Sequence, residues 1–143
     1  AMMVFGNKIS KVTSCAVMSE KGVDYSDSIT MIFEDGEMAV MHSSMLSALN
    51  RRASIFGDKG YIEVTNVNNI EKIRVFDENY KELAEYTPPE QITGYEYEVE
   101  ACRRAIQEGK TQCSEMPHEE TIRVLEIMDE MRRSWGYQIP QIV

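Results

Sequence analysis

The apolar residues of this chain change their spacing once, at Pro88-Pro89, and that change limits the folds open to it. Before the prolines, apolar and polar residues alternate, which is typical of strands whose two faces differ. After them, apolar residues recur every three to four positions, as in amphipathic helices. Because strands come first and helices follow, the pattern predicts an α+β fold: an open, largely antiparallel sheet with helices packed on one face.

The alternating region predicts a first strand at 11–19, followed by three hairpins. Asp35-Gly36 favours a type I′ turn, because both central residues of that turn need positive φ. Gly57-Asp58-Lys59-Gly60 is interpreted as a second turn between strands, since it lacks the spacing and the following helix of a phosphate loop. The segments predicted to pair are 28–33 with 37–45, 51–56 with 61–64, and 70–76 with 81–86.

Two helices are predicted after the prolines. The first stops at Gly109, and its predicted buried side is Tyr95, Val99, Cys102 and Ile106. The second begins near Pro117 and closes at Gly136, with acidic residues in its first turn and basic residues in its last, which complements the helix dipole. Its predicted buried residues are Val124, Ile127, Met128, Met131 and Trp135.

No predicted element covers the second face of the sheet. The segments 31–33 and 38–45 are apolar on both sides, so this face is expected to expose apolar surface, which in a soluble domain indicates a partner. Ten methionines suit a repackable interface, although each taken alone is better interpreted as core filler. We therefore expect the exposed face to serve for dimerisation.

Composition excludes several classes of protein. With 143 residues, 43% of them hydrophobic, the chain can bury the core of a single domain spanning 1–143. A net charge of -9 disfavours nucleic acid and anionic membrane surfaces as partners. No apolar run is long enough to span a bilayer and no signal peptide is evident, so a cytoplasmic location is expected. Cys15, Cys102 and Cys113 lack C-x-x-C spacing and are interpreted as reduced thiols.

The first six residues resemble the last turn of a helix that closes at Gly6. A helix this short is not stable alone, and the chain opens on Ala rather than Met. We interpret the chain as a piece of a longer protein. A tag remnant on a complete small protein is the alternative.

No catalytic constellation is visible. His118-Glu119-Glu120 begins like a metalloprotease helix, but position 122 is Ile where the second His would stand, so no metal site is expected. The only other histidine, His42, is interpreted as a hydrogen-bonded strand residue rather than as the lining of a pocket. Ser43-Ser44 lacks the glycines of a hydrolase nucleophile elbow.

One stretch, at the start of the first predicted helix, has features of a ligand-binding site. Gly94 permits close approach of a ligand, and Tyr95 and Tyr97 offer flat apolar faces with polar tips. In the structural alternative, Tyr95 packs in the core while Tyr97 is merely exposed. The residues leave both interpretations open.

Several short motifs follow one another in a fixed order along the chain: VFG at 4–6, IFGDKGYI at 55–62, GYEYEVEAC at 94–102, Ile106, EGK at 108–110, MPHEET at 116–121, Asp129, Arg132 and WG at 135–136. Together they resemble the C-terminal domain of the Gfo/Idh/MocA oxidoreductases, and most closely that of the dihydrodiol-dehydrogenase-like members. The resemblance covers essentially all 143 residues and depends on the ordered set rather than on any one motif.

The resemblance implies a parent enzyme whose N-terminal Rossmann domain holds NAD or NADP and is absent from this sequence. The C-terminal domain would contribute the substrate pocket and the homodimer interface. Three family features, the dinucleotide fingerprint, the Glu-Lys-Pro motif and the Asp-x-Gly-x-Tyr or Asp-x-Gly-x-His segment, are missing here and would lie before Ala1. The chain alone should therefore be inactive, with no catalytic or cofactor-binding residues.

The resulting prediction is the C-terminal domain of an NAD(P)-dependent dehydrogenase acting on a sugar, polyol or dihydrodiol-like substrate. Tyr95 and Tyr97 are its predicted substrate-binding residues. The alternative is a stand-alone, non-catalytic binding or dimerisation module that uses the open sheet.

Overall fold

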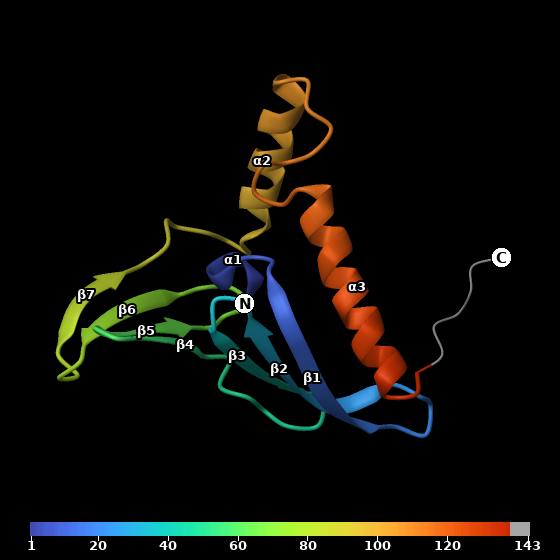
Figure 1. The fold of residues 1–143 in the computed structure, drawn as a ribbon. Coiled ribbons are helices and arrows are strands. Elements are labelled where there is room, and N and C mark those ends of the chain that lie inside the picture. The colour runs from blue at the N-terminus through green and yellow to red at the C-terminus, as the bar shows by residue number, and fades with distance from the viewer. Residues whose placement is uncertain (138–143) are drawn as a thin grey trace. The chain divides into compact units, whose positions relative to one another are not determined.

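The computed structural model describes residues 1–137 (Figure 1). The chain divides into two compact units, which we describe separately: Ala1–Leu49 together with the segment from His118 onward, and Asn50–Pro117. The single domain predicted over 1–143 stays a prediction, and its last six residues lie outside the described part. No helix within residues 1–137 is long and apolar enough to cross a membrane.

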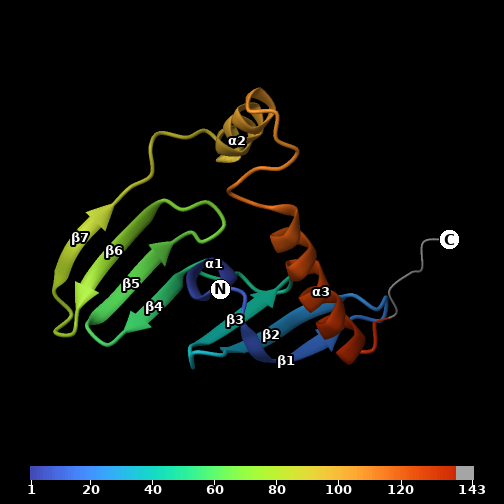
Figure 2. The same cartoon turned by 45° about the horizontal axis from the view of Figure 1, so that its top comes forward.

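The first unit is a three-stranded antiparallel sheet with one long helix across it. The sheet has the order β1-β2-β3, and both views show α3 lying along it (Figures 1 and 2). The short α1 ends at Gly6, as the first six residues predict. The elements of this unit are α1 Met2–Phe5, β1 Ile9–Met18, β2 Asp24–Phe33, β3 Met38–Ser44 and α3 His118–Ser134.

The core of the first unit lies between β2 and α3. Met31 and Phe33 of β2 pack with Ile127 and Met131 of α3, and all four are buried. The ring of Phe5 lies 5.3 Å from that of Phe33, so α1 packs on the same core. The prediction for the second helix is confirmed, because its remaining apolar residues Val124, Met128 and Trp135 are partly buried.

The opposite face of this sheet is open. The register pairs Thr30 with Val40 and Ile32 with Met38, which places these residues on the face away from Met31 and Phe33. The exposed fractions of Val17, Met38 and Val40 are 62%, 59% and 68%. Exposed apolar side chains are therefore present on this face as predicted, but the polar Ser28, Thr30 and His42 separate Val17 from Met38 and Val40.

The second unit is a four-stranded antiparallel meander followed by a helix. Its strands follow one another in the order β4-β5-β6-β7, which Figure 2 shows side by side. The predicted turn at 57–60 joins β4 to β5, and all three predicted hairpins are confirmed. The elements are β4 Ala53–Gly57, β5 Gly60–Thr65, β6 Lys72–Asp77, β7 Glu82–Tyr86 and α2 Tyr95–Gln107.

The α+β class with antiparallel strands is confirmed, but the strands form two sheets rather than one. No ladder joins β3 to β4 among the described residues, because the chain bends through residues 45–52, where Arg51 adopts a φ of 49°. Alternation determines which side chains share a face, but not which strands become neighbours.

The prediction of a buried side for α2 is wrong. Tyr95, Val99 and Ile106 are 69%, 65% and 75% exposed, and Cys102 is exposed as well. The buried residues of α2 are Ala101 and Ala105, one turn apart. The helix thus contacts its own unit through small residues, and its larger apolar side chains find no covering surface there.

Candidate functional site

The two predicted substrate-binding tyrosines lie in the first turn of α2. Gly94, directly before the helix, has a φ of 90°. Tyr95 is exposed, which contradicts the alternative that buries it in the core. Tyr97 is 44% exposed and its hydroxyl donates to the carbonyl oxygen of Pro89 at 3.3 Å. Both rings are therefore accessible from one end of the helix, and their role in substrate binding stays a prediction.

A carboxylate closes the turn that holds these tyrosines. Glu96 accepts hydrogen bonds from the backbone N–H of Gly94 (3.0 Å) and from both the N–H and the hydroxyl of Thr93. Tyr95 N–H donates back to Thr93 Oγ1 at 3.3 Å. Thr93 and Glu96 thus close the turn from both sides of the N-cap residue Gly94, although the bonds are not those of a capping box, since Thr93 Oγ1 accepts from the Tyr95 N–H. The spacing Thr93-x-x-Glu96 is a helix-start signal that sequence reasoning missed.

These donors favour the charged form of the Glu96 carboxylate. Hydrogen bonds from its own backbone N–H and from that of Ile92, with further ones from Thr93, lower the pKa of Glu96 to about 2. At neutral pH the carboxylate is thus a fixed anion at the start of α2, where the helix dipole also favours negative charge.

The Gly94 turn packs against the loop between β5 and β6. A Cβ at Gly94 would stand 3.0 Å from Asn69 Oδ1, and Gln91 Nε2 donates to the carbonyl of Ile70 at 3.3 Å. Glycine is needed here both for its positive φ and for this close approach. The backbone before Tyr95 is consequently held in place from two sides.

The described residues do not fit a dinucleotide. A helix N-terminus binds phosphate when its N–H groups are free, but at α2 the Tyr95 N–H donates to Thr93 Oγ1 and the Glu96 carboxylate lies at the same end. The first turn of α3 carries Glu119 and Glu120, which would repel a phosphate. The glycine turn at 57–60 joins two strands and opens no helix. A nicotinamide cofactor would thus need residues other than 1–137.

A small cavity lies in the first unit, beside the end of α3. Its volume is about 330 Å³, and polar and apolar side chains both line it. Arg132 Nη1 lies 3.3 Å from Asp129 Oδ1, and Trp135 Nε1 donates to Ser14 Oγ at 3.0 Å. The lining residues are Met18, Val23, Asp24, Asp129, Arg132, Trp135 and Tyr137.

The sequence did not predict this cavity, although three of its lining residues belong to the set on which the family resemblance depends. Asp129, Arg132 and Trp135 recur every three positions, which places them along one side of α3. This spacing could have indicated a shared side of the helix. A search for apolar periodicity overlooks it, because two of the three residues are polar. Within residues 1–137, no three His, Cys, Asp or Glu side chains gather into a group able to hold a metal ion.

No family model matches the chain. Comparison with individual proteins finds relatives among the dehydrogenases. The chain is 30% identical to trans-1,2-dihydrobenzene-1,2-diol dehydrogenase of Xenopus tropicalis, over 96% of this chain and 44% of that protein. It is 27% identical to scyllo-inositol 2-dehydrogenase (NADP(+)) IolU of Bacillus subtilis, over 98% of this chain and 42% of that protein.

Solved structures show the same fold. UDP-N-acetylglucosamine 3-dehydrogenase GnnA from Acidithiobacillus ferrooxidans matches with a TM-score of 0.76 at 18% identity, over 95% of this chain and 43% of that one. The aldose-aldose oxidoreductase from Caulobacter crescentus matches with a TM-score of 0.74 at 13% identity, over 94% and 41%. The relatives and the structural neighbours are of the Gfo/Idh/MocA oxidoreductase type, and the chain resembles them over nearly its whole length.

The predicted resemblance to dihydrodiol-dehydrogenase-like members of the Gfo/Idh/MocA family is thereby confirmed. The chain spans less than half the length of the relatives it matches, and this partial coverage fits a C-terminal domain. At 18% and 13% identity, the matches to solved structures show a shared fold and nothing further.

Proposed function

We propose that this chain is the substrate-pocket and dimerisation domain of an NAD(P)-dependent dehydrogenase whose substrate is a sugar, polyol or dihydrodiol-like alcohol. The observation that carries the proposal is the match to two differently named dehydrogenases over at least 96% of the chain. Both names describe cyclic compounds with neighbouring hydroxyl groups, which supports a vicinal diol as the substrate class.

Tyr95 and Tyr97 are the proposed pocket residues of this domain. Their accessible rings stand at the capped start of α2, and a tyrosine face packs against the C–H surface of a ring while its hydroxyl reaches a substrate hydroxyl. Glu96, held as an anion between them, fixes the turn and keeps anionic groups away from it. A neutral polyhydroxylated ring suits these surroundings better than a phosphorylated one.

The cofactor would be held elsewhere in the full protein, by a Rossmann domain at the N-terminal side. The carboxylates at the starts of α2 and α3, from Glu96, Glu119 and Glu120, support this assignment because they would repel the phosphates of a dinucleotide. No step of the reaction is therefore assigned to residues of this chain, which would position the substrate. We propose the cytoplasm as the location of the enzyme.

The test uses the open reading frame that encodes this chain together with its upstream sequence. The purified protein is assayed for reduction of NAD⁺ and NADP⁺ with a trans-dihydrodiol, scyllo-inositol and an aldose. Tyr95→Ala and Tyr97→Ala should each lower kcat/KM by about fivefold or more, since each removes an aromatic contact worth roughly 1 kcal/mol. Tyr86→Ala, at a tyrosine 60% exposed on the edge strand β7, is the matched control.

Two results would contradict the proposal. The first is an unchanged kcat/KM in both tyrosine variants, which would remove them from the pocket. The second is micromolar binding of NADPH to residues 1–143 alone in calorimetry, which would place the cofactor site in this chain.

The open face of the β1–β3 sheet is the proposed homodimer interface. Met38 and Val40 expose neighbouring apolar side chains on it, with Val17 farther along the same face, and exposed apolar surface indicates protein contacts. Val40→Asp should shift the protein from dimer to monomer in sedimentation velocity. Val67→Asp, at a comparably exposed valine in the β5–β6 loop, should leave the dimer intact.

The same exposed face favours a second candidate, a stand-alone dimerisation module without catalysis. Both functions predict dimers, so oligomeric state does not separate them. The upstream reading frame does: a strand followed by G-x-G-x-x-G supports the dehydrogenase, and a stop codon or an unrelated domain supports the module.

A further inference from the structure

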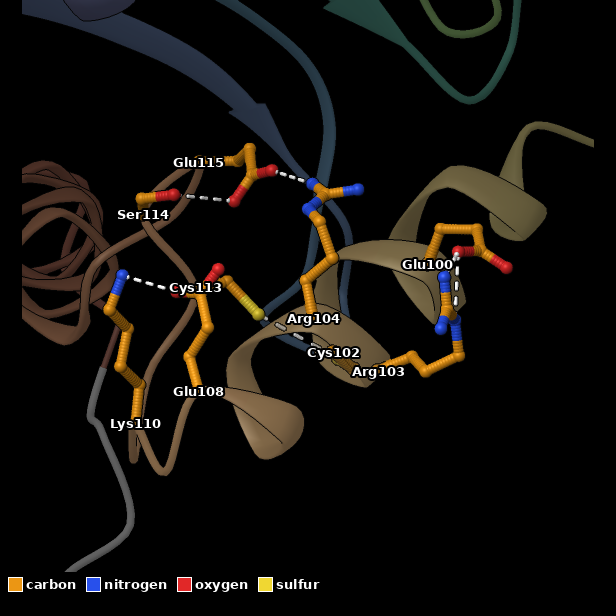
Figure 3. Close-up of polar contacts among 9 residues, drawn as sticks. All are labelled: Glu100, Cys102, Arg103, Arg104, Glu108, Lys110, Cys113, Ser114 and Glu115. Carbon is orange, nitrogen blue, oxygen red and sulfur yellow. Dashed lines mark hydrogen bonds and ion pairs between the residues drawn. The ribbon is translucent and has the colours of Figure 1, made fainter.

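Two cysteines of the second unit, eleven positions apart in the sequence, lie close together. Cys102 is on α2, and Cys113 is in the loop that leads from α2 to Pro117. Their sulfur atoms are 3.8 Å apart, with the Cys113 thiol donating to Cys102 Sγ (Figure 3). Both are free thiols. The distance is that of a contact between thiols, and about 2 Å of closure would give a disulfide bond.

The loop is folded back onto the helix by contacts on both sides of Cys113. Lys110 N–H donates to the carbonyl of Ala105 at 2.8 Å, and Gly109 permits the reversal with a φ of 69°. Arg104 of α2 pairs with Glu115 of the loop, as Figure 3 shows. The proximity of the two thiols is therefore set by backbone and ion-pair contacts as well as by the cysteines themselves.

The pair is open to small reagents and its two thiols differ. Cys102 is exposed and Cys113 is half-buried. The hydrogen bond to Cys102, with burial and the charge of Cys102, raises the pKa of the Cys113 thiol. Cys102 is the more exposed of the two sulfurs, so a small disulfide reaches it first, which makes Cys102 the attacking sulfur.

We propose that Cys102 and Cys113 form a reversible dithiol–disulfide pair, a modification site oxidised by low-molecular-weight disulfides such as oxidised glutathione. The Cys102 thiolate attacks the glutathione disulfide, so that a mixed disulfide forms at Cys102 and one glutathione thiolate leaves. Cys113 then loses its proton to solvent and attacks the Cys102 sulfur, which releases the second glutathione. Two protein thiols are oxidised and one small disulfide is reduced.

The disulfide closes a ring over residues 102–113 and ties the last turns of α2 to the connecting loop. A disulfide acts by removing freedom from the segment it closes. The oxidised form therefore holds 109–117 against α2, whereas the reduced form relies on the contacts of Lys110 and Arg104. Reduced glutathione in excess reverses the step.

The test uses the whole chain with Cys15→Ser, which removes the thiol of the other unit. Oxidised glutathione should lower the intact mass by about 2 Da, without a stable adduct. Trypsin should then release peptides 82–103 and 111–123 as one linked species that dithiothreitol separates. Amide exchange over 109–117 should slow in the oxidised form.

Two further variants decide between a pair and independent thiols. With Cys15→Ser, the added change Cys113→Ser should stop the reaction at a Cys102 adduct, a gain of about 300 Da. Cys102→Ser should leave the half-buried Cys113 to react more slowly than Cys102 does in the Cys113→Ser protein. Adducts on both thiols in the Cys15→Ser protein, or disulfides only between two chains on a non-reducing gel, would overturn the proposal.

Discussion

The indole N–H of Trp135 donates a hydrogen bond to Ser14 Oγ at 3.0 Å and joins the residue after α3 to the middle of β1. The two residues are 121 positions apart in sequence. Trp135 also packs against the core of Met31, Phe33, Ile127 and Met131. This one side chain therefore contributes to the wall of the α3 cavity and to the closure of the first unit.

Removing the acceptor should weaken the first unit measurably. Ser14→Ala leaves the half-buried indole N–H without its partner, which we expect to lower the free energy of unfolding by about 1–3 kcal/mol. Thr13→Ala, at the exposed neighbouring position on the other face of β1, should change it by about 0.5 kcal/mol or less. Urea denaturation of both variants is the measurement. Equal effects would mean that the hydrogen bond contributes nothing specific.

The packing of α3 predicts a second difference. Ile127→Ala truncates a core side chain that is 3% exposed. The cavity left behind and the lost burial of apolar surface should together lower the free energy of unfolding by about 2–5 kcal/mol. Ile122→Ala removes the same atoms at a position on α3 that is 56% exposed and should cost about 1 kcal/mol or less. Thermal unfolding followed by circular dichroism compares the two. A similar fall in Tm in both variants would show that packing of Ile127 does not hold α3 on the sheet.

The turn between β4 and β5 supplies a third test. A Cβ at Gly60 would stand 1.9 Å from the carbonyl oxygen of Phe76, and the φ of 142° disfavours other residues there. Gly60→Ala should therefore cost at least about 3 kcal/mol. Gly57→Ala, in the same turn, would meet only Gly60 O at an ordinary 3.6 Å and should be nearly neutral. The readout is the urea midpoint; equal midpoints would contradict the close approach at Gly60.

Sequence reasoning located the elements because their local chemistry agrees with the fold. The apolar stripe of α3 supplies Ile127 and Met131 to the core as predicted. Asp35-Gly36 lies between β2 and β3 as predicted, but the predicted type I′ turn is wrong. Asp35 lacks the positive φ that this turn needs, and the Gly36 N–H donates to the Phe33 carbonyl, so Glu34 and Asp35 are the central residues of the turn. The start of β2 was predicted four residues late, at Ser28 rather than Asp24. The polar residues there show no apolar alternation, and pairing with β1 makes them strand.

What sequence reasoning could not supply were relations between distant residues. The stripe of Tyr95, Val99 and Ile106 has helical spacing, but spacing does not say whether a surface covers it. The contact of Cys102 with Cys113 depends on a loop reversal at Gly109, which no cysteine-spacing rule contains. The two tyrosines were placed at the start of α2 correctly, whereas their role depends on a substrate that the chain's own residues do not identify.

The capped start of α2 predicts a pH dependence with a definite sign. The folded pKa of Glu96 is about 2, against an ordinary value of 4.5, so its stabilising effect is fully present above pH 4.5. The effect is lost as the pH falls from 4.5 through 2. The carboxyl carbon shift of Glu96 in NMR should therefore titrate near pH 2, and the protection factors of amides 93–97, which correct for the intrinsic exchange rate, should fall only as the pH drops through that range.

Glu96→Gln separates this effect from general acid unfolding. The amide cannot carry the charge, so the protection factors of amides 93–97 should be lower at neutral pH and should not change between pH 4.5 and 2. Glu98→Gln, in the same first turn, leaves the hydrogen bonds of Glu96 in place and should keep that dependence. A Glu96 midpoint near 4.5 in the unchanged chain would show that Thr93 and Gly94 do not hold the carboxylate as described.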